Sequence, residues 1–331
     1  MGDPPSTKFA ADSSAFDRES LDGLSASADA ESGPHDASDR IGSARIDADS
    51  ALFIPRDTGE ERERICAFIE KQVTDANADG VVVNMSGGLD STVSAALAVE
   101  TLGADRVYGL ILPCNKIGAP HARDAEALAD ALGIEHDTVH LQPLYAQFGA
   151  AAPDRFDLHD EPTRSGNAVA RLRMTMAYLA ANATNRLVCG TTNRSELLLG
   201  YVTKHGDGAA DLLPLGHLYK TDVRELADAL DVPEFVVEKP PSAGFLPGQR
   251  DVDDLGAPYE VIDPVLQLGI DRGLDAETIR ERFESASSEA DAESDAVGDG
   301  VDTETVTRLL ARHRETEHKR VPAPIPGNLG R

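Results

Sequence analysis

Residues 81–92 combine glycines, hydroxyl groups and one carboxylate in a pattern suited to binding phosphate. Val81–Val83 form an apolar run typical of a strand buried on both faces. Gly87 and Gly88 follow, where backbone amides can approach an anion, and the amino end of the next helix completes a phosphate cradle. Asp90 would repel phosphate in this cradle unless a divalent metal ion lay between them. This is no Walker loop, because no Gly-Lys-Ser/Thr follows at the required spacing.

The alternative interpretation of this segment is a plain tight turn between a strand and a helix. Ser86, Ser91 and Thr92 place hydroxyl groups around the glycines, which favours a ligand-binding loop. The apolar face of the following helix begins at Leu89, and the helix is expected to end at Gly103.

A second polar segment, residues 190–221, carries acidic and basic side chains between its glycines and begins Gly-Thr-Thr-Asn-Arg-Ser-Glu. The chain has only seven lysines, and Lys204, Lys220, Lys239 and Lys319 all lie in such motif-like segments. Solvated lysines would be expected to scatter, so we interpret the clustering as cationic contacts to phosphate and substrate. A polar surface loop is the alternative.

The loop Ser86–Ser91 resembles that of the N-type ATP pyrophosphatases, which cleave ATP between its α and β phosphates and transfer AMP to a substrate oxygen. This loop alone does not choose among the members of that superfamily. Residues 190–221 closely resemble the NAD synthetase family, and so do Gly166–Met174, Lys239–Ala243, Gly248–Asp251 and His318–Arg320. Several independent motifs in the right order make the resemblance specific. It implies an adenine nucleotide alpha hydrolase-like fold.

The resemblance implies a reaction in two steps. The carboxylate of nicotinic acid adenine dinucleotide (deamido-NAD) attacks the α-phosphate of ATP and releases pyrophosphate. Ammonia then attacks the adenylated carbonyl and expels AMP, which gives NAD and completes NAD biosynthesis. Neither step needs a protein nucleophile, but both need charge neutralisation and the positioning of two anions. ATP is thus expected as cosubstrate and Mg²⁺ as cofactor.

The resemblance also implies roles for individual residues. Asp90 and Glu196 would ligate magnesium, since hard oxygen donors suit that ion, and Lys220 joins them as the expected catalytic set. The expected ATP-binding residues are Asn84, Met85, Ser86, Gly87, Gly88, Leu89, Asp90, Ser91, Thr191, Lys220 and Ser242. The residues expected to bind deamido-NAD are Arg171, Lys204, Asp211, His318 and Lys319. Without the resemblance, residues 318–320 would be interpreted as a cationic helix end.

Helix geometry distinguishes the two arginines near residue 172. Arg171 and Arg173 are two positions apart, so they point to nearly opposite sides of one helix. Arg171 shares a face with Asn167 and Tyr178, and we expect it in the site. A structural salt bridge is the expected role of Arg173.

Apolar periodicity predicts strands that alternate with helices, and hence an α/β fold with a doubly wound parallel sheet of about five strands and helices on both faces. In such a sheet the ligand lies beyond the carboxyl ends of the strands. Asp222, with Glu225 three positions on, and Asp275 are expected helix caps. Besides the first strand, the expected strands are 107–112, 138–141 and 186–190.

Composition divides the chain into three parts. Residues 1–50 are mostly Ala, Asp, Ser and Gly, and we expect a disordered acidic leader outside the catalytic fold. Residues 51–331 are expected to form one domain. Residues 285–302 return to small and acidic residues, which indicates a solvated surface insertion.

The formal charge of −27, with 58 acidic residues, disfavours nucleic acid and anionic membranes as partners. Such acidity favours a halophilic protein, with an ordinary acidic cytosolic protein as the alternative. Cys66, Cys114 and Cys189 have no paired spacing, so a reducing cytoplasm is expected.

The polar leader is too short to form the amidase domain that glutamine-using members of the family carry. Ammonia is therefore the expected direct donor, unless a separate chain delivers it, and the family pattern implies a homodimer. One alternative function is another ATP pyrophosphatase, such as a GMP synthetase catalytic subunit. Another is a non-catalytic nucleotide-binding protein of the universal-stress type, which would need no carboxylate equivalent to Glu196.

Overall fold

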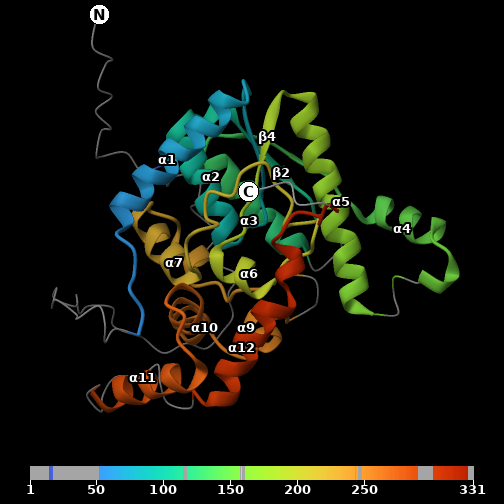
Figure 1. The fold of residues 1–331 in the computed structure, drawn as a ribbon. Coiled ribbons are helices and arrows are strands. Elements are labelled where there is room, and N and C mark those ends of the chain that lie inside the picture. Colours follow the sequence, from blue (N-terminus) through green and yellow to red (C-terminus); the bar gives the residue numbers. More distant parts are fainter. Residues whose placement is uncertain are drawn as a thin grey trace, which may run out of the picture.

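A four-stranded parallel sheet in the order β3-β2-β1-β4 lies at the centre of the molecule (Figure 1). In the computed structural model, the described residues are 15–17, 52–114, 118–156, 158, 161–242, 244, 248–289 and 301–326. The register places Val81 of β1 opposite residues of both β2 and β4, so β1 is an interior strand. The strands are β1 (Gly80–Asn84), β2 (Val107–Ile111), β3 (Glu135–Thr138) and β4 (Arg186–Cys189).

Helices connect the strands and extend the fold beyond β4. Among the described residues, no helix is both long enough and apolar enough to cross a membrane. The α-helices are α1 (Thr58–Asp75), α2 (Leu89–Leu102), α3 (Gly118–Ala131), α4 (Gln142–Ala151), α5 (Pro162–Ala183), α6 (Arg194–Leu199), α7 (Lys220–Ala229), α8 (Glu234–Val237), α9 (Asp251–Leu255), α10 (Tyr259–Leu266), α11 (Ala276–Glu289) and α12 (Thr303–Glu315). Short helical turns are η3 (Ala104–Arg106), η4 (Asp154–Phe156), η5 (Gln267–Asp271) and η6 (Glu317–Lys319).

The two faces of the sheet pack against different helices, because successive side chains of a strand point to opposite sides. Val81 and Val83 belong to a cluster with apolar residues of α1, α2, α3 and α7. Val82 belongs to a second cluster with residues of α4 and α5. A third cluster joins α6, α10, α11 and α12 below the sheet (Figure 1). The predicted doubly wound α/β fold is confirmed.

The sheet of the described residues has four strands, against the expected number of about five. Leu212 pairs with Cys189 of β4 through a single bridge, and the Gly190 N–H donates to the Leu212 carbonyl at 2.9 Å. Pro214 follows two residues later and has no N–H to continue a ladder. The segment that could have formed a fifth strand therefore ends as one bridge.

Two local predictions were displaced along the chain. The third strand covers 135–138 and not 138–141. The prediction followed the apolar residues Val139 and Leu141, whereas β3 is a half-exposed edge strand made mostly of polar residues. The helix expected to be capped by Asp222 begins at Lys220, and the Asp222 carboxylate accepts from the Tyr219 N–H at 3.0 Å. The cap at Asp275 is confirmed, since its Oδ1 accepts from the Thr278 N–H at 2.9 Å.

Residues 15–17 pack on the domain, which differs from the expectation for the leader. Phe16 is 5% exposed and belongs to the cluster that contains Val81. The Asp17 N–H donates to the Ala131 carbonyl at the end of α3, at 2.8 Å. The rest of the leader lies outside the described residues, as do residues 290–300 of the insertion expected at 285–302. Residues 285–289 belong to α11.

Candidate active site

The glycine loop between β1 and α2 has a backbone that requires glycine. Gly87 has φ of +73°, and a Cβ there would lie 2.6 Å from the carbonyl oxygen of His121. A side chain would therefore be both strained and blocked. The hydroxyl oxygens of Ser86 and Ser91 lie 3.0 Å apart, and that of Ser86 accepts from the Gly88 N–H at 3.3 Å. These hydroxyls hold the loop in shape at the amino end of α2.

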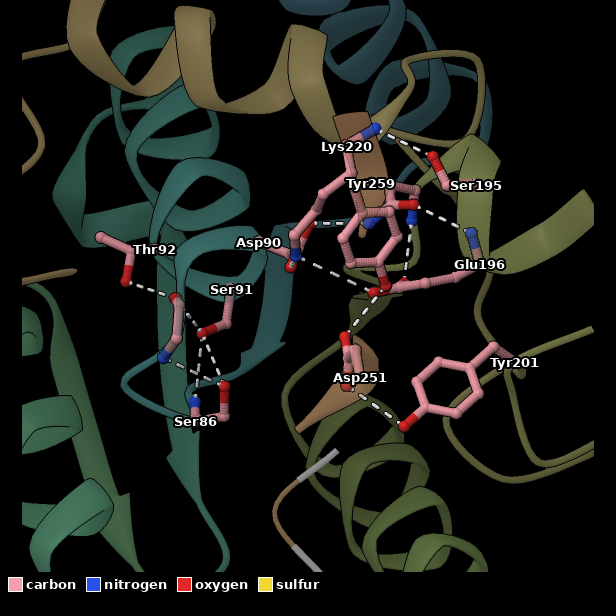
Figure 2. Close-up of polar contacts among 12 residues, drawn as sticks. Ser86, Asp90, Ser91, Thr92, Ser195, Glu196, Tyr201, Lys220, Asp251 and Tyr259 are labelled. Carbon is pink, nitrogen blue, oxygen red and sulfur yellow. Dashed lines mark hydrogen bonds and ion pairs between the residues drawn. The ribbon is translucent and has the colours of Figure 1, made fainter. Parts of the chain in front are cut away.

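Three charged side chains meet above this loop (Figure 2). Lys220, the first residue of α7, forms an ion pair with Asp90 in the first turn of α2. The Lys220 Nζ also lies 4.0 Å from Glu196 Oε1 in α6. Asn193 connects the two carboxylates, because its Nδ2 donates to Asp90 Oδ1 at 2.9 Å and its backbone N–H donates to Glu196 Oε2 at 3.3 Å.

Burial makes the electrostatics of this cluster strong. Burial and the neighbouring charge of Asp90 raise the pKa of Glu196 to about 8, against the opposing effect of Lys220. Burial alone would lower the pKa of Lys220, but Asp90 and Glu196 outweigh it, so this pKa is raised and the lysine stays charged. Two carboxylates thus share one cation, which leaves the cluster able to accept further positive charge.

Aromatic rings and a third carboxylate border Lys220 on its other side (Figure 2). The Lys220 Nζ lies 5.7 Å from the centre of the Tyr259 ring, a cation–π distance. The Tyr259 hydroxyl donates to Asp251 Oδ2 at 2.9 Å, and the Tyr201 hydroxyl donates to Asp251 Oδ1 at 3.1 Å. Burial raises the pKa of Asp251. This buried acid lies in a recognised motif, yet the sequence analysis gave it no role.

A cavity of about 320 Å³ opens beside the cluster. Every residue expected to bind ATP lines it, and so does Glu196. The cavity lies where the loops after β1 and β4 diverge, which is the switch point of the doubly wound sheet. Asn84 lines this cavity, and its Oδ1 is buried without a hydrogen-bond partner. A buried acceptor of this kind is unfavourable until a ligand supplies a donor or a cation.

The residues expected to bind deamido-NAD do not line this cavity, but four of them lie close together. An Arg171 guanidinium N–H donates to the Lys204 carbonyl at 3.2 Å, and the Lys204 Nζ bonds to the His318 carbonyl. The Lys319 Nζ donates to the Gly200 carbonyl at 2.6 Å. Gly200 and Lys204 therefore join α5 to η6.

Asp211 bonds to partners other than those four residues. Its Oδ2 accepts from the Val188 N–H of β4 at 2.8 Å, and its Oδ1 accepts from the Tyr178 hydroxyl at 3.3 Å. Asp211 therefore ties the edge of the sheet to α5.

The two arginines of α5 do point to different sides, but Arg173 is closer to the nucleotide cavity than expected. Asn167 shares the Arg171 face, and its Oδ1 accepts from the Thr203 hydroxyl at 2.7 Å. Arg173 donates from Nε to the Leu112 carbonyl at 3.1 Å and lines the cavity. Arg171 is exposed and does not line it. A spacing argument separates the faces of a helix but does not say which cavity each one borders.

Lys239 is a second cavity residue to which the sequence analysis assigned no specific contact. Its Nζ donates to the Gly87 carbonyl at 2.9 Å and to Asp124 Oδ2 at 2.7 Å. It therefore fastens the glycine loop to α3. The concentration of scarce lysines in motif-like segments was the signal that pointed to it.

A parallel sheet with a glycine loop and an acidic pair at its switch point defines a nucleotide-binding α/β protein. Comparison with protein families takes this further: the model of the NAD synthase family matches residues 61–323. The chain belongs to that family.

Individual relatives agree with this assignment. An NH(3)-dependent NAD(+) synthetase from Methanosarcina mazei is 42% identical over 271 residues, which cover 82% of this chain and 98% of that protein. The solved NMN synthetase from Francisella tularensis is 35% identical with a TM-score of 0.67, covering 82% of this chain and 99% of that one. The NH3-dependent NAD synthetase from Campylobacter jejuni is 26% identical with a TM-score of 0.63, covering 82% of this chain and 100% of that one.

Proposed function

We propose that this chain is an ammonia-dependent NAD synthetase, a ligase that converts deamido-NAD, ATP and ammonia into NAD, AMP and pyrophosphate. The observation that carries the proposal is the buried cluster of Asp90, Lys220 and Glu196 beside the glycine loop, in a chain of the NAD synthase family. The curated relative that it matches over nearly that protein's whole length bears this name.

In the first step, an oxygen of the nicotinate carboxylate bonds to the α-phosphorus of ATP as the bond to the leaving pyrophosphate breaks. The loop amides and the amino end of α2 would hold the phosphates, and Lys220 would offset their charge. Thr191 and Ser242, which also line the cavity, would contact the rest of the nucleotide.

In the second step, the nitrogen of ammonia bonds to the acyl carbon, AMP leaves with the electrons of the C–O bond, and the nitrogen loses a proton. The protein's task is to keep the acyl adenylate and ammonia together and to exclude water. The dinucleotide would be held by Arg171, Lys204, Asp211, His318 and Lys319. Because the amines of Lys204 and Lys319 bond to backbone carbonyls, substrate binding would have to share or displace those bonds.

The donor set at the cavity fits magnesium. Among the described residues, no three His, Cys, Asp or Glu side chains converge as a ready-made metal site. Asp90 and Glu196 supply two carboxylate ligands. Mg²⁺ needs no further protein ligand, because it takes substrate phosphates and water for its remaining positions. When bound, Mg²⁺ would neutralise the charge that develops on the pyrophosphate. The unpartnered Asn84 Oδ1 is a further acceptor at the same cavity.

The proposal includes a homodimer formed through α4, η4 and α5. These successive elements carry apolar side chains that remain exposed: Leu144 (43%), Phe148 (50%), Phe156 (49%) and Leu179 (60%). Apolar exposure of this kind favours burial against another protein surface. A second copy of the chain is the partner that the family resemblance supports.

The proposal also includes a cytoplasmic setting at high salt. The formal charge of −27 produces self-repulsion that concentrated salt would screen. The three cysteines are buried and free, which suits a reducing compartment.

A coupled assay tests the proposed reaction. The protein is supplied with deamido-NAD, ATP, magnesium and ammonium at high potassium chloride, and NAD is followed with alcohol dehydrogenase. NAD with an equal amount of AMP is the expected result. ATP consumption without NAD would point to another acceptor or nitrogen donor, and no ATP consumption would favour a binding protein.

A second candidate function is amidation of the mononucleotide. It is favoured by the 35% identity to the solved NMN synthetase, which extends over 99% of that protein. The chemistry is the same, but the substrate lacks the adenylate half. Supplying nicotinic acid mononucleotide in the same assay separates the two, since the enzyme that we propose has the higher kcat/KM with the dinucleotide.

A further inference from the structure

A fully buried carboxylate lies directly behind the charged cluster and belongs to neither the cavity lining nor any motif noted above. Asp263, on α10, has 0% exposure. Its Oδ1 accepts from the Ser195 hydroxyl at 2.5 Å. Its Oδ2 accepts from the Thr221 N–H at 2.9 Å and from the Thr221 hydroxyl at 3.0 Å. One carboxylate thus joins the first turns of α6 and α7.

The partners of Asp263 are the immediate neighbours of the site residues. Ser195 precedes Glu196, and Thr221 follows Lys220. The Ser195 hydroxyl also accepts from the backbone N–H of Lys220, at 2.9 Å. Since that hydroxyl donates to Asp263 and accepts from Lys220, it connects the carboxylate to the lysine backbone.

Helix physics gives this arrangement its strength. The first N–H groups of a helix have no partner within the helix, and they attract an anion. In α7 these groups belong to Lys220 and Thr221, and Ser195 and Asp263 satisfy them from other elements. One turn earlier on α10, Tyr259 lies beneath the Lys220 ammonium. Helix α10 therefore supports both the backbone and the side chain of the lysine.

We infer that Asp263 is a positioning residue that sets the placement of Lys220 relative to Glu196. The inference rests on the proposed function, because that function gives the Lys220–Glu196 pair its task. Asp263 does not line the cavity, so it would not touch the substrate. It acts by fixing α6 and α7 against each other, so that both side chains meet the phosphates without reorganisation.

The test compares Asp263→Asn with Asp222→Asn. Asp222 is the control because it is also a buried carboxylate, with 4% exposure, and lies in the first turn of α7 with Lys220. Unlike Asp263, it accepts from the Tyr219 and Arg56 N–H groups. At a temperature well below both melting points, Asp263→Asn is expected to lower kcat about tenfold or more, while the KM for deamido-NAD changes less than about twofold. Asp222→Asn is expected to lower Tm but to keep kcat within about twofold.

A second pair of variants and a binding measurement make the test independent of folding and of the overall reaction. Ser195→Ala and Thr221→Val each remove part of the network, and both are expected to lower kcat. They replace Asp263→Asn in the test if that variant does not fold. Calorimetry with magnesium-ATP is expected to show weaker binding in Asp263→Asn and wild-type binding in Asp222→Asn. Equal kcat and ATP affinity in all variants would overturn the inference. If the wild type binds magnesium-ATP but forms no NAD, the proposed reaction fails, and calorimetry still decides the role of Asp263.

Discussion

Asp90 and Lys220 form a buried ion pair between the first turns of two helices whose paired residues lie 130 positions apart in the chain. Their side chains are 17% and 5% exposed, so water screens the charges little. Removing one partner of a buried pair leaves the other uncompensated, at a cost of about 3–5 kcal/mol. Here Glu196 lies 4.0 Å from the same amine and offers it a second partner.

Asp90→Asn is therefore expected to leave the fold intact and to abolish pyrophosphate release. The amide cannot supply the anionic oxygen that a magnesium ion prefers, and a loss of about a hundredfold or more in kcat is expected. Pyrophosphate release and circular dichroism measure the two effects. Turnover that persists with ordinary magnesium dependence would remove Asp90 from the proposed metal ligands.

Gly87→Ala is expected to destroy nucleotide binding, whereas Gly103→Ala is expected to affect stability alone. Both glycines have positive φ, at +73° and +84°. A Cβ at Gly87 would meet the His121 carbonyl at 2.6 Å, but one at Gly103 has no atom within 4 Å. Gly103, with φ of 84° and ψ of 151°, thus carries a backbone strain of about 1–3 kcal/mol on substitution, without the clash. Titration calorimetry with ATP checks both, and equal ATP affinity in the two variants would contradict the expected geometry.

Phe16→Ala is expected to lower the free energy of unfolding by about 1.5–3 kcal/mol, the value of burying one phenylalanine side chain. The loss cannot exceed the free energy with which residues 15–17 dock. Deleting residues 1–50 should lower stability similarly and leave kcat unchanged, because none of residues 15–17 lines the cavity. Thermal unfolding and the NAD assay measure these effects. Phe68→Ala is the control, because the Phe68 side chain is 38% exposed. A large fall in kcat would show that the leader contributes to the active site.

The stability of the wild type is expected to fall relative to Asp263→Asn as pH rises from about 4 to 7. Burial raises the pKa of Asp263 to about 7 from 3.8, and the hydrogen bonds from Ser195 and Thr221 oppose the rise. In this window the folded protein keeps a proton that the unfolded chain releases, so folding weakens as that proton is lost. Each unit of raised pKa corresponds to about 1.4 kcal/mol. Denaturant unfolding of both proteins across this range measures the difference, and a constant difference would contradict the shift.

Leu179→Glu is expected to convert a dimer into monomers. A charge placed on a 60%-exposed position is harmless in a monomer but must be desolvated in an interface. Light scattering at high potassium chloride gives the molecular mass. Ile54→Glu, at a 39%-exposed position outside α4 and α5, is the matched control. A wild-type protein that is already monomeric, or a variant that remains dimeric, would remove this interface.

The parts of the fold that the sequence could predict are those set by neighbouring residues. The run from Val81 to Leu89 specifies strand, glycine loop and helix in consecutive positions, and the structure has all three. Lysine scarcity pointed to Lys220 and Lys239, and both line the cavity. Lys204 and Lys319 carried the same signal but bond to backbone carbonyls away from the cavity.

What the sequence could not predict depends on tertiary packing. Asp263 follows an apolar stretch of α10, and nothing near it in the chain tells that α6 and α7 will supply its donors. Phe16 stands alone among small polar residues, so its burial depends on a surface built by distant segments. The possible fifth strand was limited to one bridge by the proline that follows it.

The Asp90 side chain finds its partners at Asn193 and Lys220, 103 and 130 positions downstream. The glycine loop can form as soon as β1 and α2 pair locally, but contacts of such long range close only late, after a large loss of chain entropy. A fragment that stops short of Lys220 therefore lacks a charged residue of the site. During synthesis or refolding, activity therefore appears only after α7 has docked. A chain cut between α2 and α6 can regain activity only if its two pieces reassociate.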